Sequence, residues 1–200
     1  MIGITGSVGK SSTREILYGI LKEHFPTKVI AGNTETGLPL GILGLKAESL
    51  GFETMLVSLI DWLRIFILAP ILTNSLKGFK YLIIEMSIDD PYPPKNMEYL
   101  LTIVKPDIAV VLNVAPVHTM QFEKIIGNGK KEFANEEEKV DFLVQKIAEE
   151  KVKIITQSGC KNAIYNADNK YVTNAIQLYY SANVGASVTE SGNPDSSRIL

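Results

Sequence analysis

The hydrophobic pattern of this chain alternates between short apolar runs and segments whose apolar residues recur at helical spacing. The short runs predict strands at 2–5, 27–31, 80–87, 107–114 and 162–167. The helical spacing predicts helices at 10–24, 38–47, 96–104, 135–155 and 169–182. Two runs, "KYLIIEMS" and "DIAVVLNV", are almost continuously apolar, as strands covered on both faces are. This alternation predicts an α/β fold in which a mostly parallel sheet has helices on both faces.

One apolar stretch is longer than the others. "TMLVSLIDWLRIFILAPILT" (54–73) approaches the length of a membrane span, which takes about 20 residues. Asp61 and Arg64 lie in its middle, and placing both charges inside a bilayer would cost about 5–7 kcal/mol. Their spacing puts them on one helical face. We therefore expect an apolar helical insertion at about 50–78 that packs on its own protein. A helix that contacts a membrane surface or a partner is the alternative, and a true span is the least favoured.

The composition is that of a globular protein. The chain has 200 residues, of which 46% are hydrophobic and 21% charged, and its formal net charge of −2 gives no basic field for nucleic acid. The single cysteine, Cys160, excludes an internal disulfide, and the first residues do not resemble a signal peptide, so we expect a cytoplasmic protein. We expect one domain at 1–184, whose first strand is truncated, and a polar tail or truncated continuation at 185–200.

A glycine-rich turn joins the first strand to the first helix. Its sequence is Thr5-Gly6-Ser7-Val8-Gly9-Lys10-Ser11-Ser12. In a phosphate-binding turn of this kind, backbone N–H groups and the helix N-terminus face the anion, the lysine neutralises the outer phosphates, and the serine hydroxyl binds Mg²⁺. The strict pattern would have glycine where Ile4 stands, but the strand–turn–helix context is the required one. The turn therefore predicts a nucleotide-phosphate site.

An acidic residue follows the next long apolar run. Glu85 comes directly after Tyr81–Ile84, and nucleotide sites place an acidic Mg²⁺ ligand at the end of a neighbouring buried strand. The alternative is a solvated residue at a strand end. A GTPase would also need Asn-Lys-x-Asp after a later strand, where this chain has Asn113-Val114-Ala115-Pro116. The sequence therefore argues against a GTPase.

Taken in order, these motifs resemble those of a known family. Thr-Gly-x-x-Gly-Lys-Ser-Ser, then Gly-Asn…Gly-x-Pro, a strand ending in Glu, and Asn-x-x-x-x-His are similar to the ATP-binding central domain of the Mur ligases, which include folylpolyglutamate and cyanophycin synthetases. The resemblance covers residues 1 to about 180. It implies a P-loop NTPase-like fold, ATP and Mg²⁺ as cofactors, and ADP-forming ligation of an acid to an amino acid through an acyl phosphate.

The resemblance also implies roles for individual residues. Lys10 would hold the ATP phosphates, Ser11 and Glu85 the first Mg²⁺, and His118 a second Mg²⁺ beside the reacting carboxylate. The family uses a lysine carbamylated by CO₂ as a further ligand, and "IAEEK" before "NADN" assigns that role to Lys151. That lysine shares the apolar helix face of Val144 and Ile147.

The chain has other lysines and a second histidine that could fill these roles. Lys130 and Lys131 compete with Lys151, which could instead be a snorkelling lysine at a helix edge. His24 has no motif around it.

Substrate contacts follow from the same resemblance. Asn166 and Asp168 would lie on the base and ribose side of the nucleotide, and Asn33 would face the acyl substrate. The turn around Asn33 departs from the usual Gly-Asn-x-Asn-Asn. "NADN" and "IAEEK" most resemble the subgroup that adds D-alanyl-D-alanine to UDP-N-acetylmuramoyl-tripeptide. The full-length enzyme would thus take a UDP-linked muramoyl peptide and an amino acid or dipeptide.

Mur ligases carry substrate domains on both sides of the central one, and the resemblance here covers the central domain alone. We therefore expect a central domain alone or a fragment, which would not turn over in isolation. Two functions of other classes remain open: a non-catalytic ATP-binding module, tethered through 54–73 to a membrane or partner, and another P-loop enzyme such as a small-molecule kinase.

Overall fold

A computed structural model describes residues 1–45, 55–74, 76–117, 119–127 and 132–187. Its strands are β1 (Ile2–Thr5), β2 (Thr27–Ile30), β3 (Tyr81–Glu85), β4 (Ile108–Val111) and β5 (Asn162–Tyr165). Its helices are α1 (Lys10–Leu21), α2 (Gly37–Ile42), α3 (Met55–Asn74), α4 (Met97–Ile103), α5 (Thr119–Phe122), the 3₁₀ helix η2 (Glu123–Ile125), α6 (Glu136–Thr156) and α7 (Lys170–Ser187). Most predicted elements are present, usually with shorter ends. α2 ends earlier than expected, α5 was not predicted, and α7 extends into the expected tail.

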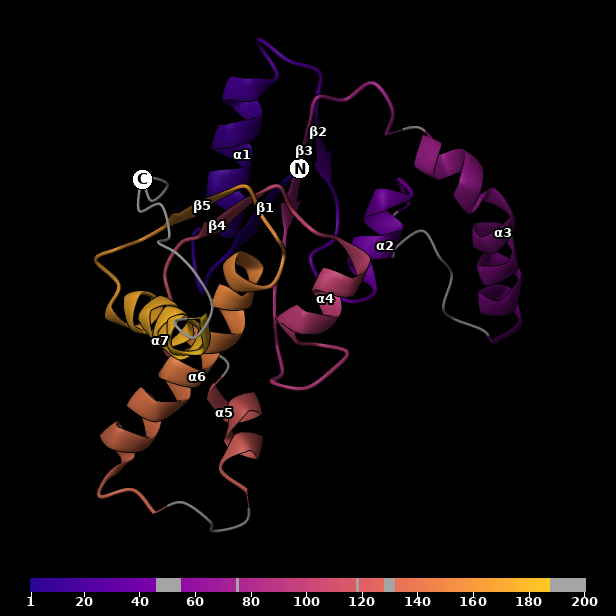
Figure 1. Cartoon of the computed structure of the whole chain (residues 1–200). Coiled ribbons are helices and arrows are strands. Elements are labelled where there is room, and N and C mark those ends of the chain that lie inside the picture. The colour runs from indigo at the N-terminus through magenta and orange to yellow at the C-terminus, as the bar shows by residue number, and fades with distance from the viewer. Residues whose placement is uncertain (46–54, 75, 118, 128–131, 188–200) are drawn as a thin grey trace.

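The five strands form one parallel sheet, which confirms the predicted α/β class (Figure 1). The strand order is β2-β3-β1-β4-β5, so β1 lies at the centre. Ile4 of β1 is in register with Glu85 of β3, and Thr5 is in register with Val111 of β4. The carboxyl ends of the three central strands therefore meet at one edge of the sheet, where open α/β folds bind their ligands.

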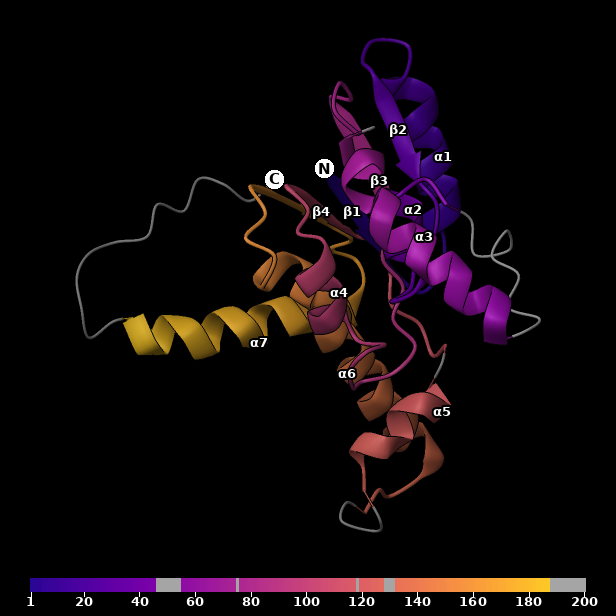
Figure 2. The ribbon, with the colours of Figure 1, turned by 90° about the vertical axis from the view of Figure 1, so that its right-hand side faces the viewer.

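The two faces of the sheet are covered very differently (Figure 2). On one face α1 packs against a small cluster formed by Ile2, Ile4, Ile83 and Val110. On the other, α4, α6 and α7 build a much larger core with the opposite side of the sheet. A Cβ at Gly3 would lie 2.9 Å from the Pro106 side chain and 3.1 Å from that of Ile154, so this glycine lets α6 approach β1 closely.

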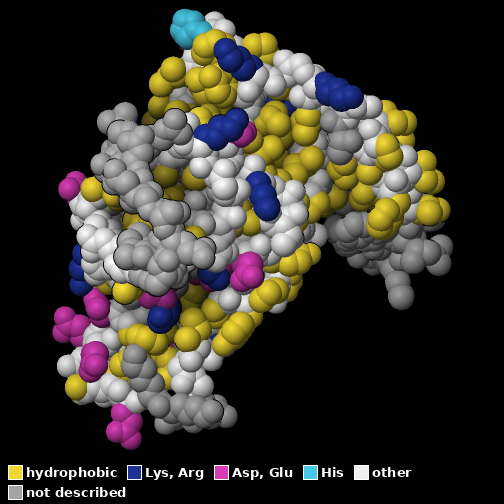
Figure 3. Space-filling view, viewed as in Figure 1, with side chains coloured by type: hydrophobic (Ala, Val, Ile, Leu, Met, Phe, Trp, Pro, Cys, Tyr) yellow, Lys and Arg dark blue, Asp and Glu magenta, His cyan; other side chains and the backbone are white. Residues whose placement is uncertain are grey.

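Helix α3 corrects one expectation. The apolar stretch is helical, but it lies at the outer edge of the molecule instead of packing into it, and hydrophobic side chains gather on it (Figures 1 and 3). Leu63, Phe66, Ile67 and Ile71 are 62–73% exposed, whereas Ile65 is buried. Because apolar residues occur all round the helix, packing one side leaves an equally apolar side outward. The side chains of the two mid-stretch charges, expected on one face, lie outside the described part.

None of the described helices combines the length and the hydropathy that crossing a bilayer requires.

Candidate functional site

The glycine turn forms a tight loop between β1 and α1. Gly9 adopts a left-handed conformation with φ 85° at the N-cap of α1, a backbone state that favours glycine. The helix begins at Lys10, whose Nζ folds back and donates a hydrogen bond to the carbonyl oxygen of Gly6 at 2.9 Å. The turn thus places a cation and a helix N-terminus at the same point, which is the arrangement that binds phosphate.

A polar cavity of 290 Å³ opens beside this turn. Its walls come from the ends of β1 and β3, from the turn after β2 and from α6, and consist of Gly6, Ser7, Lys10, Asn33, Thr34, Ser87, Ile88, Asp89 and Lys151. Segments from four parts of the sequence therefore converge here. Asp89 was not predicted to line the site. Its position four residues after Glu85, just beyond the same strand, could have indicated it.

Glu85 lies beside the turn and is buried, at 3% exposed, so it is not the solvated residue of the alternative interpretation. Its Oε2 accepts a hydrogen bond from the Ser11 hydroxyl at 3.2 Å. Its Oε1 lies 2.7 Å from a guanidinium nitrogen of Arg14. Arg14 was not predicted, although a residue three positions after Ser11 shares its helix face. The pair of Ser11 and Glu85 offers two hard oxygen donors at the end of the sheet.

Lys151 reaches the same turn from the far end of the sequence. It is 4% exposed, and its Nζ donates a hydrogen bond to the Gly6 carbonyl oxygen at 3.3 Å. Val144 and Ile147 are buried on the same stretch of α6, as the helical register predicted. Burial, followed by the nearby charge of Lys10, lowers the pKa of Lys151 to about 8, and Asp89 partly opposes this shift. The amine is therefore easier to deprotonate than an exposed lysine.

The loop after β4 is tied to the glycine turn. The Ser7 N–H donates to the Asn113 carbonyl at 2.7 Å, and the Ala115 N–H donates to the Ser7 hydroxyl at 3.1 Å. The described part of this loop ends at Val117, so His118 lies outside the described residues. Lys130 and Lys131, the competitors of Lys151, lie outside them as well.

The remaining predicted residues divide into two groups. Asn33 lines the cavity, and its carbonyl accepts a hydrogen bond from the Ser87 N–H at 2.8 Å. Asn166 and Asp168 lie after β5 at the same edge of the sheet, where the Asp168 N–H donates to the Asn166 side chain at 3.0 Å. Both are exposed and neither lines the cavity. His24 is exposed just beyond α1, away from the turn.

Comparison with known proteins shows the family to which this chain is similar. A family model described as the Mur ligase middle domain matches residues 4–144. Two curated relatives are UDP-N-acetylmuramoyl-tripeptide--D-alanyl-D-alanine ligases. That of Borreliella burgdorferi is 28% identical over 126 residues, which are 62% of this chain and 20% of the relative. That of Buchnera aphidicola is 29% identical over 129 residues, which are 64% of this chain and 21% of the relative. The chain thus spans about a fifth of the length of either relative.

Two solved structures share the fold. The MurF ligase from Thermotoga maritima, in complex with ADP, superimposes with a TM-score of 0.52 at 25% identity, covering 89% of this chain and 30% of that one. MurF from Acinetobacter baumannii gives a TM-score of 0.50 at 21% identity, covering 90% of this chain and 29% of that one. The second likeness concerns the fold alone.

Proposed function

Because the chain belongs to the Mur ligase family through its middle domain, we propose that it is the nucleotide-binding core of an ATP-dependent, ADP-forming ligase of peptidoglycan precursor synthesis. One observation carries the proposal. Lys10 and Lys151, from opposite ends of the sequence, both donate hydrogen bonds to the carbonyl oxygen of Gly6. Their convergence beside a polar cavity suits a site in which Lys10 holds the phosphate end of a nucleotide and Lys151, once carbamylated, holds an ion next to it. The relative from Thermotoga maritima, which holds ADP, supports the same choice.

The reaction we propose has two steps. A carboxylate oxygen of the acyl substrate attacks the γ-phosphorus of ATP, a P–O bond forms, and ADP leaves with the electrons of the broken bond. The amine of the second substrate then attacks the acyl carbon, inorganic phosphate leaves, and the amine proton passes to a base. In both steps the chain's own contribution is to hold the phosphates with Lys10 and the backbone of the turn, which orients the reacting groups and offsets their charge.

Mg²⁺ fits the residues present. Ser11 and Glu85 provide a hydroxyl and a carboxylate oxygen 3.2 Å apart, and Mg²⁺ is commonly held by one carboxylate together with substrate phosphates. When bound, Mg²⁺ would neutralise phosphate charge. We propose His118 and Lys151 as holders of a second ion. For Lys151 this requires its neutral amine to add to the carbon of CO₂, forming an N–C bond and releasing one proton. Its burial and lowered pKa support that chemistry.

The substrates belong to the proposal as well. The acyl partner would be a UDP-linked muramoyl peptide and the amine partner an amino acid or dipeptide, following the names of the curated relatives. Asn33, on the cavity wall, is proposed to face the acyl substrate, and Asn166 and Asp168 the base and ribose of the nucleotide. Residues 1–184 would form the central domain, in the cytoplasm where these precursors are made. A folylpolyglutamate- or cyanophycin-synthetase-like ligase is the alternative within the family.

Calorimetric titration of the chain with ATP and Mg²⁺ tests the nucleotide site, and binding that Lys10→Ala weakens strongly would support it. To test the reaction, the chain replaces the middle domain of a curated relative, and ADP release is measured with each substrate alone and with both. ADP release and amide formation that require both substrates identify the ligase. A stable phosphorylated product without amide identifies a kinase and overturns the proposal.

A second candidate function rests on the exposed apolar side of α3. We propose that this side contacts a partner protein, since a helix apolar all round is normally covered on both sides. ATP binding without turnover, with aggregation relieved when Phe66 and Ile67 are changed to serine, would favour a tethered nucleotide-binding module. Sedimentation of the chain with lipid vesicles would instead assign the surface to a membrane.

A further inference from the structure

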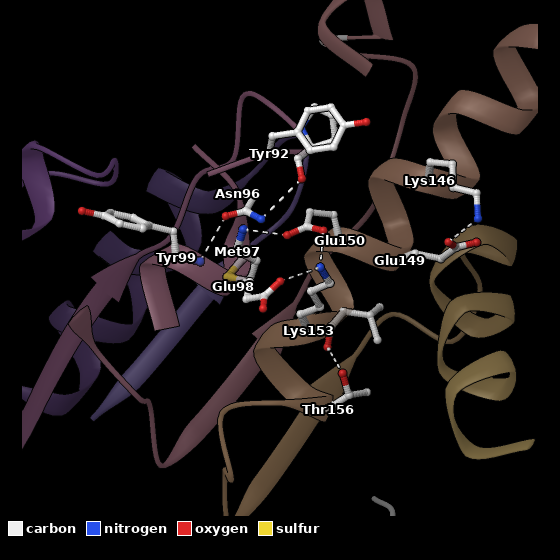
Figure 4. A network of polar contacts seen from close by, with 12 residues as sticks. Tyr92, Asn96, Met97, Glu98, Tyr99, Lys146, Glu149, Glu150, Lys153 and Thr156 are labelled. Carbon is white, nitrogen blue, oxygen red and sulfur yellow. Dashed lines mark hydrogen bonds and ion pairs between the residues drawn. The ribbon is translucent and has the colours of Figure 1, made fainter. Parts of the chain in front are cut away.

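Three consecutive residues of α6 are directed to three different parts of the molecule. Glu149 pairs with Lys146 along its own helix at 2.5 Å (Figure 4). Glu150 points across to the start of α4 (Figure 4). Lys151 contacts the Gly6 carbonyl in the glycine turn. Because Glu150 and Lys151 are adjacent in α6, contacts that fix Glu150 also restrict the position of Lys151.

Glu150 is held by two strong contacts. It is 6% exposed, its Oε1 accepts a hydrogen bond from the Met97 N–H at 2.9 Å, and its Oε2 lies 2.6 Å from Lys153 Nζ. Met97 is the first residue of α4, so its N–H is one of the donors that a helix cannot satisfy internally. A carboxylate at this place is also favoured by the helix dipole. Glu150 thus caps α4 from another helix, beside the ordinary cap that Asn96 provides to the Tyr99 N–H.

This contact joins two walls of the cavity. α4 continues from the segment that follows β3, where Ser87 and Asp89 line the cavity, and the Asp89 N–H donates to the Lys95 carbonyl just before α4 at 3.1 Å. α6 supplies Lys151 from the opposite side. A buried ion pair adds little net stability compared with apolar packing of the same volume, so stability alone does not account for a carboxylate here. Fixing one wall against the other does account for it.

We propose that Glu150 is a positioning residue: by linking α6 to the N-terminus of α4, it holds the Lys151 amine at the Gly6 carbonyl. The proposal deepens the function proposed above and rests on Lys151 serving that site. Glu149 provides a matched control, because it lies on the same helix, has the same charge and forms an ion pair at the same three-residue spacing, but with the preceding Lys146 and at 31% side-chain exposure.

The test compares Glu150→Ala, Glu150→Gln and Glu149→Ala with the unchanged chain. Each protein reacts with an amine-directed reagent at about pH 10, where even an unperturbed lysine amine, with a pKa of about 10.4, is about 30% neutral. Mass spectrometry follows Lys151, with the exposed Lys161 as internal reference and urea unfolding as the measure of global stability. We expect Glu150→Ala to label Lys151 about tenfold faster, equivalent to about 1.4 kcal/mol of local protection. Glu149→Ala should leave the rate unchanged.

Glu150→Gln keeps an acceptor for the Met97 N–H, so it should restore most of the protection even if the alanine variant folds poorly. An unchanged Lys151 rate in both folded Glu150 variants overturns the proposal, and so does an equal rise in Glu149→Ala. A second readout uses ¹³C-bicarbonate and carbon NMR to detect a carbamate on Lys151. If the unchanged chain forms none, the carbamylation in the proposed function fails, while the labelling rates still decide the role of Glu150.

Discussion

Each face of the sheet places one lysine amine at the Gly6 carbonyl oxygen, but the two lysines are positioned in different ways. On the α1 face, Lys10 lies four residues from Gly6, and although all of α1 lies in the described part, none of its residues is buried. On the α6 face, Lys151 comes from a position 145 residues away in sequence and is set in the large core. A local turn therefore places one cation, and tertiary packing places the other.

The difference separates binding from stability. The position of Lys10 depends on backbone geometry that the glycines of the turn dictate, so the α1 face can carry its function with little core. The position of Lys151 depends on every layer that packs α6 against the sheet, so changes in that core should affect both folding and the site.

The largest effect should come from the core beside Lys151. Ile147→Ala removes a side chain that is 2% exposed and lies one turn before the lysine, and we expect a loss of about 3–4 kcal/mol in the free energy of unfolding. Leu17→Ala, in the small cluster on the α1 face, removes a partly buried side chain and should cost less than half as much. Urea denaturation of both variants measures the contrast, and equal losses would contradict it.

A second effect concerns the pH dependence of stability. The pKa of Lys151 is about 8 in the folded chain and 10.5 when unperturbed. Between these values the unfolded chain binds one more proton, so stability should rise with pH, by up to about 3 kcal/mol across this window. Lys151→Met should remove this component. The difference between the two unfolding curves, measured at about pH 8 and about pH 10, isolates it from other titrating groups; identical slopes would refute the assignment.

A smaller effect is expected for the nucleotide. Lys10→Ala removes one charge-assisted hydrogen bond to phosphate and should weaken Mg·ATP binding by about 2 kcal/mol, or about thirtyfold, with little change in stability. Isothermal titration calorimetry measures the affinity. Lys22 lies just beyond α1, with its cation over the Tyr18 ring. Lys22→Ala serves as the control and should bind Mg·ATP as the unchanged chain does.

The smallest effect should be on the outer side of α1. Ile16 is 63% exposed, so Ile16→Gln should change the free energy of unfolding by no more than about 0.5 kcal/mol and leave nucleotide binding unaltered. Thermal and urea unfolding provide the check. A loss above about 1 kcal/mol would mean that this side of α1 is covered, and the contrast between the faces would be weaker than described.

Much of this architecture could be predicted because its signals are local. Apolar runs predicted the parallel sheet, and the glycine pattern predicted the turn between β1 and α1, which lines the cavity with Gly6, Ser7 and Lys10. The periodicity of α6 placed Lys151 among buried residues, as observed. The carboxylate that follows the β3 run lies next to the turn because adjacent parallel strands end at the same edge.

What the sequence did not predict depends on partners from other elements. Arg14 meets Glu85, and Glu150 meets Met97, only after separate segments have packed, and no spacing in the chain encodes these pairs. The exposed side of α3 was missed for a related reason: apolar residues surround most of this helix, and only Asp61 and Arg64 distinguish one face from the others.

The Gly6 carbonyl has one further consequence. It serves as a placeholder acceptor for Lys10, so that ammonium group is already directed at one point before any anion arrives. An incoming phosphoryl oxygen then exchanges with a neutral backbone oxygen and gains the difference between two acceptors. Such a site should respond to ligand with little rearrangement of its side chains.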